Sequence, residues 1–221
     1  MKWIYVLAGI ALSLKILLTS NFIVADESTL EIVQAVIQES GVPNAVSGII
    51  LRNRLYDTIF EVVVFSIAIF GVNYLLANEK PSPQVRQFSD PPSIVLARLG
   101  ATIAALVGVE LALRGHLSPG GGFAAGVAGG TAIGLIAITS SMEVMQSIYK
   151  RWHTATWEKI SVITFICLSM FTLAGIELPH GQLGALLSGG MLPILNILVA
   201  IKVALGSWAV ILLFIRYRGL L

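Results

Sequence analysis

Long apolar stretches alternate with short polar segments along the chain, and six of them are long enough to form membrane-spanning helices. A helix needs about 20 mostly apolar residues to cross about 30 Å of hydrocarbon. The pattern therefore predicts an all-α, polytopic integral membrane protein with about six transmembrane helices. Lys15 interrupts the first stretch, which favours an uncleaved membrane anchor over a cleaved signal peptide. We expect the spans at residues 3–19, 57–77, 93–113, 121–140, 158–178 and 192–215.

Polar residues between the spans divide the chain into two modules. The segment 78–92 holds four prolines together with charged residues, which indicates a helix-breaking linker. We expect a two-helix membrane module over residues 1–80, a linker over 81–92 and a four-helix module over 93–221. Within the first module, apolar residues recur at helical spacing over 28–40, which predicts an amphipathic helix on the outer membrane surface.

Composition agrees with this class and excludes several others. Hydrophobic residues make up 56% of the chain and charged residues 12%, with a mean hydropathy of +0.87, whereas soluble domains average about 25% charged residues. The net charge of +2 comes without a dense basic run, so no nucleic-acid partner is expected. The single cysteine, Cys167, belongs to no CxxC motif, and dinucleotide-binding and haem motifs are absent from the sequence. We therefore predict a membrane component without catalytic activity, cofactor or structural metal.

Basic residues outside the spans predict the orientation. With an even number of spans both termini share one side, which collects eight Lys and Arg residues against three on the other side. The positive-inside rule then places both termini in the cytoplasm. The eight are Lys2, Lys80, Arg86, Lys150, Arg151, Lys159, Arg216 and Arg218, and the three are Arg52, Arg54 and Arg114.

Small residues recur at every fourth position on two consecutive spans. They are Gly100, Ala104, Gly108 and Ala112 on the first span and Gly122, Gly126, Gly130 and Gly134 on the second. In lipid, such ridges let helix backbones approach closely, so we expect a tight hairpin in which Gly126, Gly130 and Gly134 act in helix packing. The hairpin loop is a candidate gate motif, in which His116 is either a surface histidine or a proton acceptor at an entrance. Its residues are Arg114, His116, Pro119, Gly120, Gly121 and Gly122.

Ionisable residues within or beside the spans are the candidate ion pathway, because a charge in hydrocarbon costs several kcal/mol unless a partner or water compensates it. Asp57, Glu61, Glu110 and Glu177 fall in the outer third of their expected helices, and only Lys202 lies near the midplane. Two explanations stay open for Glu110, which either serves the pathway or is merely neutralised by Arg114. Lys202 either pairs with a carboxylate of another helix or titrates. Because these acids lie only in the outer third, we expect partner subunits to complete the inner half of the path.

Two groups of residues resemble a known family. Arg114–Phe123, the glycine-ridged helix after it, 192–197 and 201–203 closely resemble the MnhB/MrpB-type component of the Mrp/Mnh multisubunit sodium/proton antiporters and its counterpart in archaeal membrane-bound hydrogenases. In the first module, Asn44-Ala-Val and 54–61 look like the small protein that corresponds to part of the C-terminal extension of MrpA, the large antiporter component. The resemblance covers residues 93–221 most specifically and implies Na⁺/H⁺ exchange in a large complex of the cell membrane.

The resemblance also bears on the type of complex. In ordinary Mrp systems the first module is the tail of the large MrpA component, whereas ferredoxin-linked respiratory complexes split that tail into small subunits. A chain with this module beside an MnhB-like module therefore favours the respiratory type, a membrane-bound hydrogenase or a sulfur-reducing relative. The expected partners are other antiporter-module subunits, the lipid bilayer, Na⁺ and H⁺. The alternatives are a structural component of a stand-alone Mrp antiporter and a self-contained small transporter, against which the lack of an inverted repeat argues.

Overall fold

The computed structural model describes residues 10, 14, 27–82, 85 and 87–219, so the expected span over 3–19 lies almost entirely outside the described residues. The chain divides into two compact units, Met1–Ala35 and Val36–Leu221. Helix α2 (Glu27–Ser40) begins in the first unit and ends in the second. It confirms the helix expected over 28–40, and Leu30, Ile32 and Val33 are exposed on it. Its place on the outer membrane surface stays a prediction.

The second unit is built from helices, and the described residues contain no strand. Four helices are long and apolar enough to cross a membrane, and α6 is a shorter apolar helix beside them. The prediction of an all-α polytopic membrane protein is therefore confirmed. The helices are α3 (Ala45–Gly48), the π-helical turn η1 (Ile49–Asn53), α4 (Leu55–Leu76), α5 (Pro91–Arg114), α6 (Gly122–Ala137), α7 (Met142–Arg151), α8 (Thr154–Leu173) and α9 (Leu192–Arg218).

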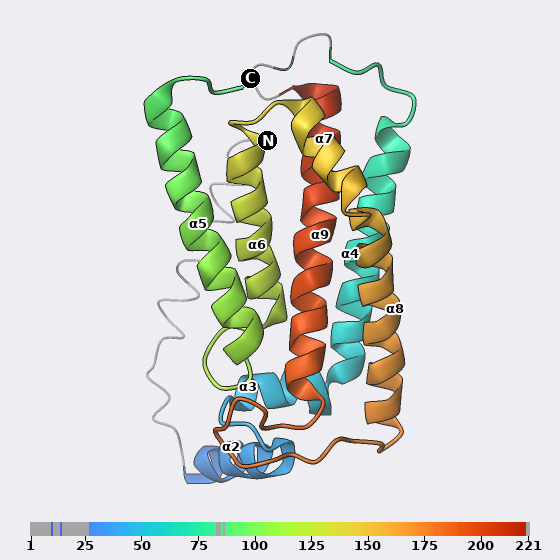
Figure 1. Ribbon diagram of the computed structural model, residues 1–221. Coiled ribbons are helices and arrows are strands. Elements are labelled where there is room, and N and C mark those ends of the chain that lie inside the picture. Colours follow the sequence, from blue (N-terminus) through green and yellow to red (C-terminus); the bar gives the residue numbers. More distant parts are fainter. Residues whose placement is uncertain (1–9, 11–13, 15–26, 83–84, 86, 220–221) are drawn as a thin grey trace. The chain divides into compact units, whose positions relative to one another are not determined.

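Helix α9 lies at the centre of the second unit and contacts α4, α5, α6 and α8 (Figure 1). Its neighbours α5 and α6 form the expected hairpin. The largest buried apolar cluster joins α4, α8 and α9 through side chains that include Val62, Phe165, Leu195, Val199 and Val203. The contact of α4 with α8 and α9 buries the last helix of the expected first module against the second. The division into modules at 81–92 stays a prediction.

Among the spans expected over described residues, the one placed at 158–178 differs most from the structure. Helix α8 begins at Thr154, after His153 in the left-handed conformation with φ 49°, and it ends at Leu173. Gly175 follows with φ 79°, a value that stops a right-handed helix and suits glycine. The shift puts Glu158 one turn inside α8. It also moves Glu177 from the expected helix into the loop between α8 and α9.

The two ends of the second unit differ in their number of basic residues. We call them the α3 end, where α4, α6 and α9 begin, and the α7 end, where those helices finish and the amphipathic helix α7 lies (Figure 1). Helix α7 was not expected from the sequence. Ser141 caps it, with its hydroxyl accepting from the Val144 amide at 3.4 Å. Arginines 52, 54 and 114 are at the α3 end, whereas Lys80, Lys150, Arg151, Lys159, Arg216 and Arg218 are at the α7 end.

Candidate functional site

The glycine ridge of α6 faces α9. A Cβ atom added to Gly126 would overlap the side chain of Val203, and one added to Gly130 would lie 2.8 Å from the Cβ of Ser207. At Gly134 the added atom would meet Ile211 Cδ1 at 3.5 Å, which is ordinary contact. A Cβ atom added to Gly122 would lie 2.5 Å from the carbonyl oxygen of Asn196. The ridge is therefore in close contact with α9 at Gly122, Gly126 and Gly130 and in ordinary contact at Gly134. Its main partner is α9, which the sequence pattern alone did not identify.

Two asparagines from different elements donate hydrogen bonds to the hairpin loop and the end of α5. The Asn44 amide nitrogen donates to the carbonyl oxygens of Gly115 and Ser118, each at 2.8 Å. The Asn196 amide nitrogen donates to the carbonyl oxygens of Leu111 and Ala112 at 3.1 and 2.7 Å. Most of these carbonyls belong to the last turn of α5 and the residue after it, where a helix leaves its acceptors unsatisfied. The loop is therefore fixed in place by α9 and by the segment before α3.

His116 lies under the loop between α8 and α9 and not on the surface. Its side chain is fully buried, and within the described residues neither ring nitrogen has a hydrogen-bond partner. Burial lowers the pKa of His116 below its usual value, although the nearby backbone of Leu186 and Ala185 acts in the opposite direction. The surface alternative for His116 is therefore wrong. A neutral imidazole is the form that this site favours.

The glycines of the loop line a small cavity at the α3 end, and Glu61, an exposed residue, lines it as well. The cavity has a volume of about 160 Å³ and lies among α4, η1, the hairpin loop and α9. Gly120 and Gly121 have φ values of 150° and 121°, which side chains rarely adopt. Its polar and loop-motif lining comprises Ser47, Thr58, Glu61, Gly120, Gly121 and Gly122. Pro119 precedes these glycines and is exposed.

Two of the other predicted pathway acids form exposed pairs with nearby arginines. Asp57 pairs with Arg54, and the Glu110 carboxylate lies 3.1 Å from the Arg114 guanidinium. Neither acid lines the same cavity as Glu61. For Glu110, the pair with Arg114 agrees with one of its two predicted roles, neutralisation by this arginine.

Glu177 belongs to a separate charged cluster. Its carboxylate accepts from Arg52 at 2.5 Å and lies 3.0 Å from His180 Nε2. Arg52 also approaches the carboxylate of Glu39 at 3.5 Å. Burial alone would raise the pKa of Glu177, but the hydrogen bonds and charges of Arg52 and His180 outweigh it, so the pKa is lowered. The structure thus does not bring the four predicted acids together, and no group of three metal-ligating side chains exists among the described residues.

Lys202 pairs with a carboxylate of another helix, as one of the two alternatives anticipated. The partner is Glu158 of α8, a residue at the very edge of the span expected over 158–178 and therefore not among the predicted pathway acids. The Lys202 side chain is fully buried and that of Glu158 is 14% exposed. The ammonium also lies 4.8 Å from the centre of the Phe65 ring. The expectation that this chain has acids only toward one end is therefore wrong.

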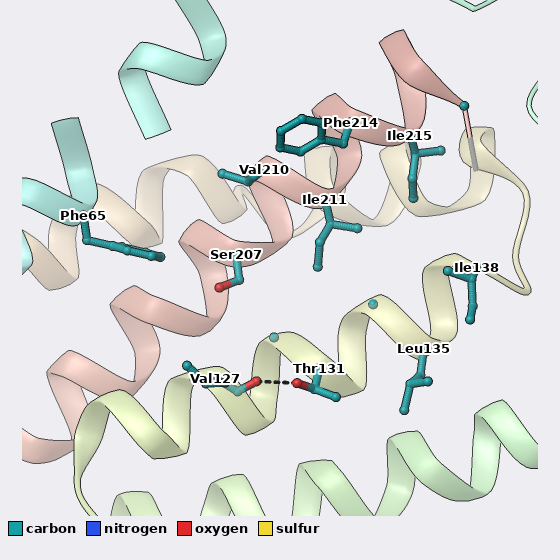
Figure 2. Close-up of a pocket in the computed structure, with 13 residues that line it drawn as sticks. Phe65, Val127, Thr131, Leu135, Ile138, Ser207, Val210, Ile211, Phe214 and Ile215 are labelled. Atoms are coloured by element: carbon teal, nitrogen blue, oxygen red, sulfur yellow. Dashed lines mark hydrogen bonds between the residues drawn. The ribbon is translucent and has the colours of Figure 1, made fainter. Parts of the chain in front are cut away.

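A larger cavity lies elsewhere and has no ionisable side chain in its lining. It has a volume of about 700 Å³ and opens between α6 and α9, with Phe65 at one end (Figure 2). Figure 2 shows Ile211, Phe214 and Leu135 around it, and only Thr131 and Ser207 add hydroxyl groups. The Thr131 hydroxyl donates to the Val127 carbonyl at 2.8 Å, within its own helix. Because no carboxylate lines this cavity, it is a weaker candidate for a cation site than the cavity beside Glu61.

A family described as a domain related to the MnhB subunit of Na⁺/H⁺ antiporters matches residues 92–209, more than half of the chain. The chain belongs to this MnhB-related family. The predicted resemblance to the MnhB/MrpB-type antiporter component is thereby confirmed, and the chain is a multi-pass membrane subunit of the cation-antiporter type. No curated protein sequence matches it.

Two solved structures share the fold. One is a chain of the membrane-bound sulfane sulfur reductase, an archaeal respiratory membrane complex, with 24% identity and a TM-score of 0.71. That match covers 96% of each chain. The other is a chain of the Mrp complex from a Dietzia species, with 16% identity, a TM-score of 0.65, and coverage of 95% of this chain but 25% of the other. Both matches extend beyond the residues of the MnhB-related domain and include most of the first module.

Proposed function

We propose that this chain contributes to the Na⁺ path of a multisubunit cation/proton antiporter module, with Glu61 as the central cation-binding group. The observation that carries the proposal is the cavity in which Glu61 meets the loop Gly120–Gly122. This cavity joins an acid of the first module to the loop motif on which the resemblance to MnhB-like proteins rests. It therefore links the two parts of the chain at one polar site.

The chemistry of the cavity suits a hard cation. Na⁺ favours carboxylate, hydroxyl and carbonyl oxygen ligands. Glu61 supplies a carboxylate, Ser47 and Thr58 supply hydroxyls, and the glycine loop brings backbone close to the space. A volume of about 160 Å³ holds an ion with a few waters, since a water occupies about 30 Å³ in the liquid. Among the four predicted acids, Glu61 is the one without an ion pair in the described residues. The other three acids are paired with arginines and act on the electrostatic potential along the path to the site; they are Asp57, Glu110 and Glu177.

The type of complex and the orientation are part of the proposal. We propose a ferredoxin-linked respiratory complex of the cell membrane, in which other antiporter-module subunits are the partners and the redox chemistry belongs to them. The match along the full length of a sulfane sulfur reductase chain supports this choice over a stand-alone Mrp antiporter. The excess of basic residues at the α7 end supports a cytoplasmic location for that end, where α9 finishes. With the expected even number of spans, we propose the same side for both termini. Under this orientation Glu61 faces the outer side.

The experiment is Na⁺-dependent transport by the whole complex in vesicles, at equal assembled amounts. Glu61→Gln removes the charge but keeps the shape of the side chain. We expect the half-saturating Na⁺ concentration to rise at least tenfold, because a carboxylate about 4 Å from a cation contributes up to roughly 4 kcal/mol at an effective dielectric constant of about 20. Glu110→Gln is expected to change it less, since Arg114 already offsets that charge.

Glu79→Gln is the matched control, because Glu79 pairs with Arg218 at the α7 end, away from the cavity. A Glu61→Gln complex with unchanged transport and unchanged half-saturating Na⁺ would contradict the proposal. The second candidate function, a purely structural role in the complex, would then stand. The arginine pairs of Asp57, Glu110 and Glu177 are the observation that favours it, since they account for three acids without any ion.

A further inference from the structure

The buried pair of Lys202 and Glu158 has no part in the cation site described above. It lies between α8 and α9, and the ammonium contacts the Phe65 ring of α4. We propose that this pair is a proton-binding site reached from the α7 end, and that its net charge controls the affinity of the Glu61 cavity for a cation. The inference rests on the proposed function, because it assigns the regulation of that same cation site.

The cost of burial is the first argument. Removing two charges from water costs several kcal/mol per ion, and apolar residues of similar volume often stabilise a protein equally well or better. Lys202 is fully buried, yet its place in α9 is surrounded by apolar residues such as Val199 and Val203. An ion pair is thus a poor choice if packing is the only requirement. A pair of titratable groups can, however, gain or lose a proton.

Access from one side is the second argument. Glu158 lines a cavity of about 330 Å³ at the α7 end, whereas Lys202 does not reach it. Asn73, Gln146 and Tyr149 line the same cavity and offer polar groups that can hold water. Three cations, Lys150, Lys159 and Arg216, stand at the cavity as well. A proton from that side therefore meets Glu158 first, and Lys202 is the inner member of the pair.

Proton balance gives the pair three charge states. When both groups are ionised the net charge is zero. A proton that arrives through the cavity forms an O–H bond on Glu158, and the pair then carries a charge of about +1 on Lys202. Loss of a proton from Lys202, through Glu158 to the cavity, breaks an N–H bond and leaves a charge of about −1 on Glu158. The titratable groups that share the cavity with Glu158 are Tyr149 and Lys150 from α7, Lys159 from α8 and Arg216 from α9. The residues that α4 contributes, which include Phe65 beside Lys202 and Asn73 in the cavity lining, are not ionisable.

Phe65 provides the connection to the cation site. It follows Glu61 by one helical turn on α4, so the two side chains share a face. The Lys202 ammonium at 4.8 Å from the Phe65 ring is therefore roughly 10 Å from Glu61, by the pitch of the helix. At that separation and an effective dielectric constant of about 20, one unit of charge changes a cation's binding constant by about tenfold to twentyfold. A protonated pair lowers cation affinity and a deprotonated pair raises it, and by linkage a bound cation favours proton release by the same factor.

The test measures the half-saturating Na⁺ concentration of the reconstituted complex at each pH over the range in which the parent complex stays assembled. Glu61 also binds protons, so the pH dependence of the parent has two contributions. The double variant Glu158→Met with Lys202→Met removes the pair and keeps an apolar contact of similar volume. We expect this variant to assemble. On acidification, its half-saturating Na⁺ concentration should rise by a factor about ten times smaller than that of the parent.

A second variant distinguishes charge from packing. Glu158→Lys with Lys202→Glu keeps the ion pair but places the carboxylate beside Phe65, so the half-saturating Na⁺ concentration is expected to fall below that of the parent. Glu143→Gln on α7 is the control, since this acid does not line the cavity of Glu158 and its residue is exposed. It is expected to match the parent at every pH.

The outcomes separate the two proposals. If Glu61→Gln weakens Na⁺ activation while the double methionine variant keeps the full pH dependence, the cation site stands and the proton pair is refuted. If Glu61→Gln has no effect, the proposed function fails whatever the pair variants do. Failure of both pair variants to assemble would assign the pair to structure and also overturn the inference.

Discussion

Gly126 is the position where the helix packing can be tested most sharply, because its control lies in the same chain. A Cβ atom at Gly126 would overlap the Val203 side chain and come within 2.9 Å of the carbonyl oxygen of Ala200. Atoms in favourable contact are about 3.5–4.0 Å apart, so α6 must retreat from α9 by the order of 1 Å. A gap of that size forfeits roughly a quarter to a half of each facing dispersion contact. We expect Gly126→Ala to destabilise the protein by about 1–3 kcal/mol.

Gly71→Ala is the matched control. Gly71 lies within α4, and a Cβ atom added there meets nothing within 4 Å. Alanine is about 1 kcal/mol more favourable than glycine within a helix, so this variant is expected to be as stable as the parent or slightly more stable. The assay is thermal denaturation of the purified complex in detergent, where each kcal/mol corresponds to about 2–4 °C for a domain of this size. Equal melting temperatures for Gly126→Ala and Gly71→Ala would show that the ridge of α6 is not a close contact with α9.

Two further predictions concern orientation and pH. Single-cysteine labelling in a background without Cys167 should modify Pro119→Cys only from outside and Lys150→Cys only from the cytoplasm, and the reverse pattern would invert the orientation. The lowered pKa of Glu177 means that its ionised form stabilises the fold fully above its unfolded pKa of about 4.3 and ceases to do so as pH falls through the folded value. Thermal stability of the parent should therefore drop as pH falls below this unfolded value, whereas Glu177→Gln should show a shallower dependence, and parallel curves would deny Glu177 that role.

The helices of this protein were largely predictable because their signal is local. Apolar runs of sufficient length predicted α4, α5, α6 and α9 to within a few residues, and the same composition excluded soluble and nucleic-acid-binding classes. Helix α8 was placed four residues too late, since its start depends on the left-handed conformation of His153. Backbone states of that kind are rare for residues other than glycine, and sequence periodicity does not reveal them.

The partners of the polar residues were much less predictable. Lys202 was expected to need a carboxylate, but the choice of Glu158 depends on how α8 packs against α9. Likewise Arg52 reaches Glu177 across 125 positions of the chain. Only pairs within one helical turn, such as Glu110 with Arg114, could be read from spacing. The burial of His116 was missed because the loop that covers it shows no regular pattern.

The hydrogen bonds between Asn44 and the hairpin loop affect how the two modules stay together. The amide of Asn44 reaches Gly115 and Ser118, which lie 71 and 74 positions further along the chain. On separate polypeptides these bonds would form only by a collision between two proteins. On one polypeptide the tether sets an effective concentration of the order of millimolar, which holds partners together even when their intrinsic affinity is low. The linker thus fixes a one-to-one ratio of the two modules. It also ensures that the hairpin loop finds Asn44, which binds it, on the same polypeptide.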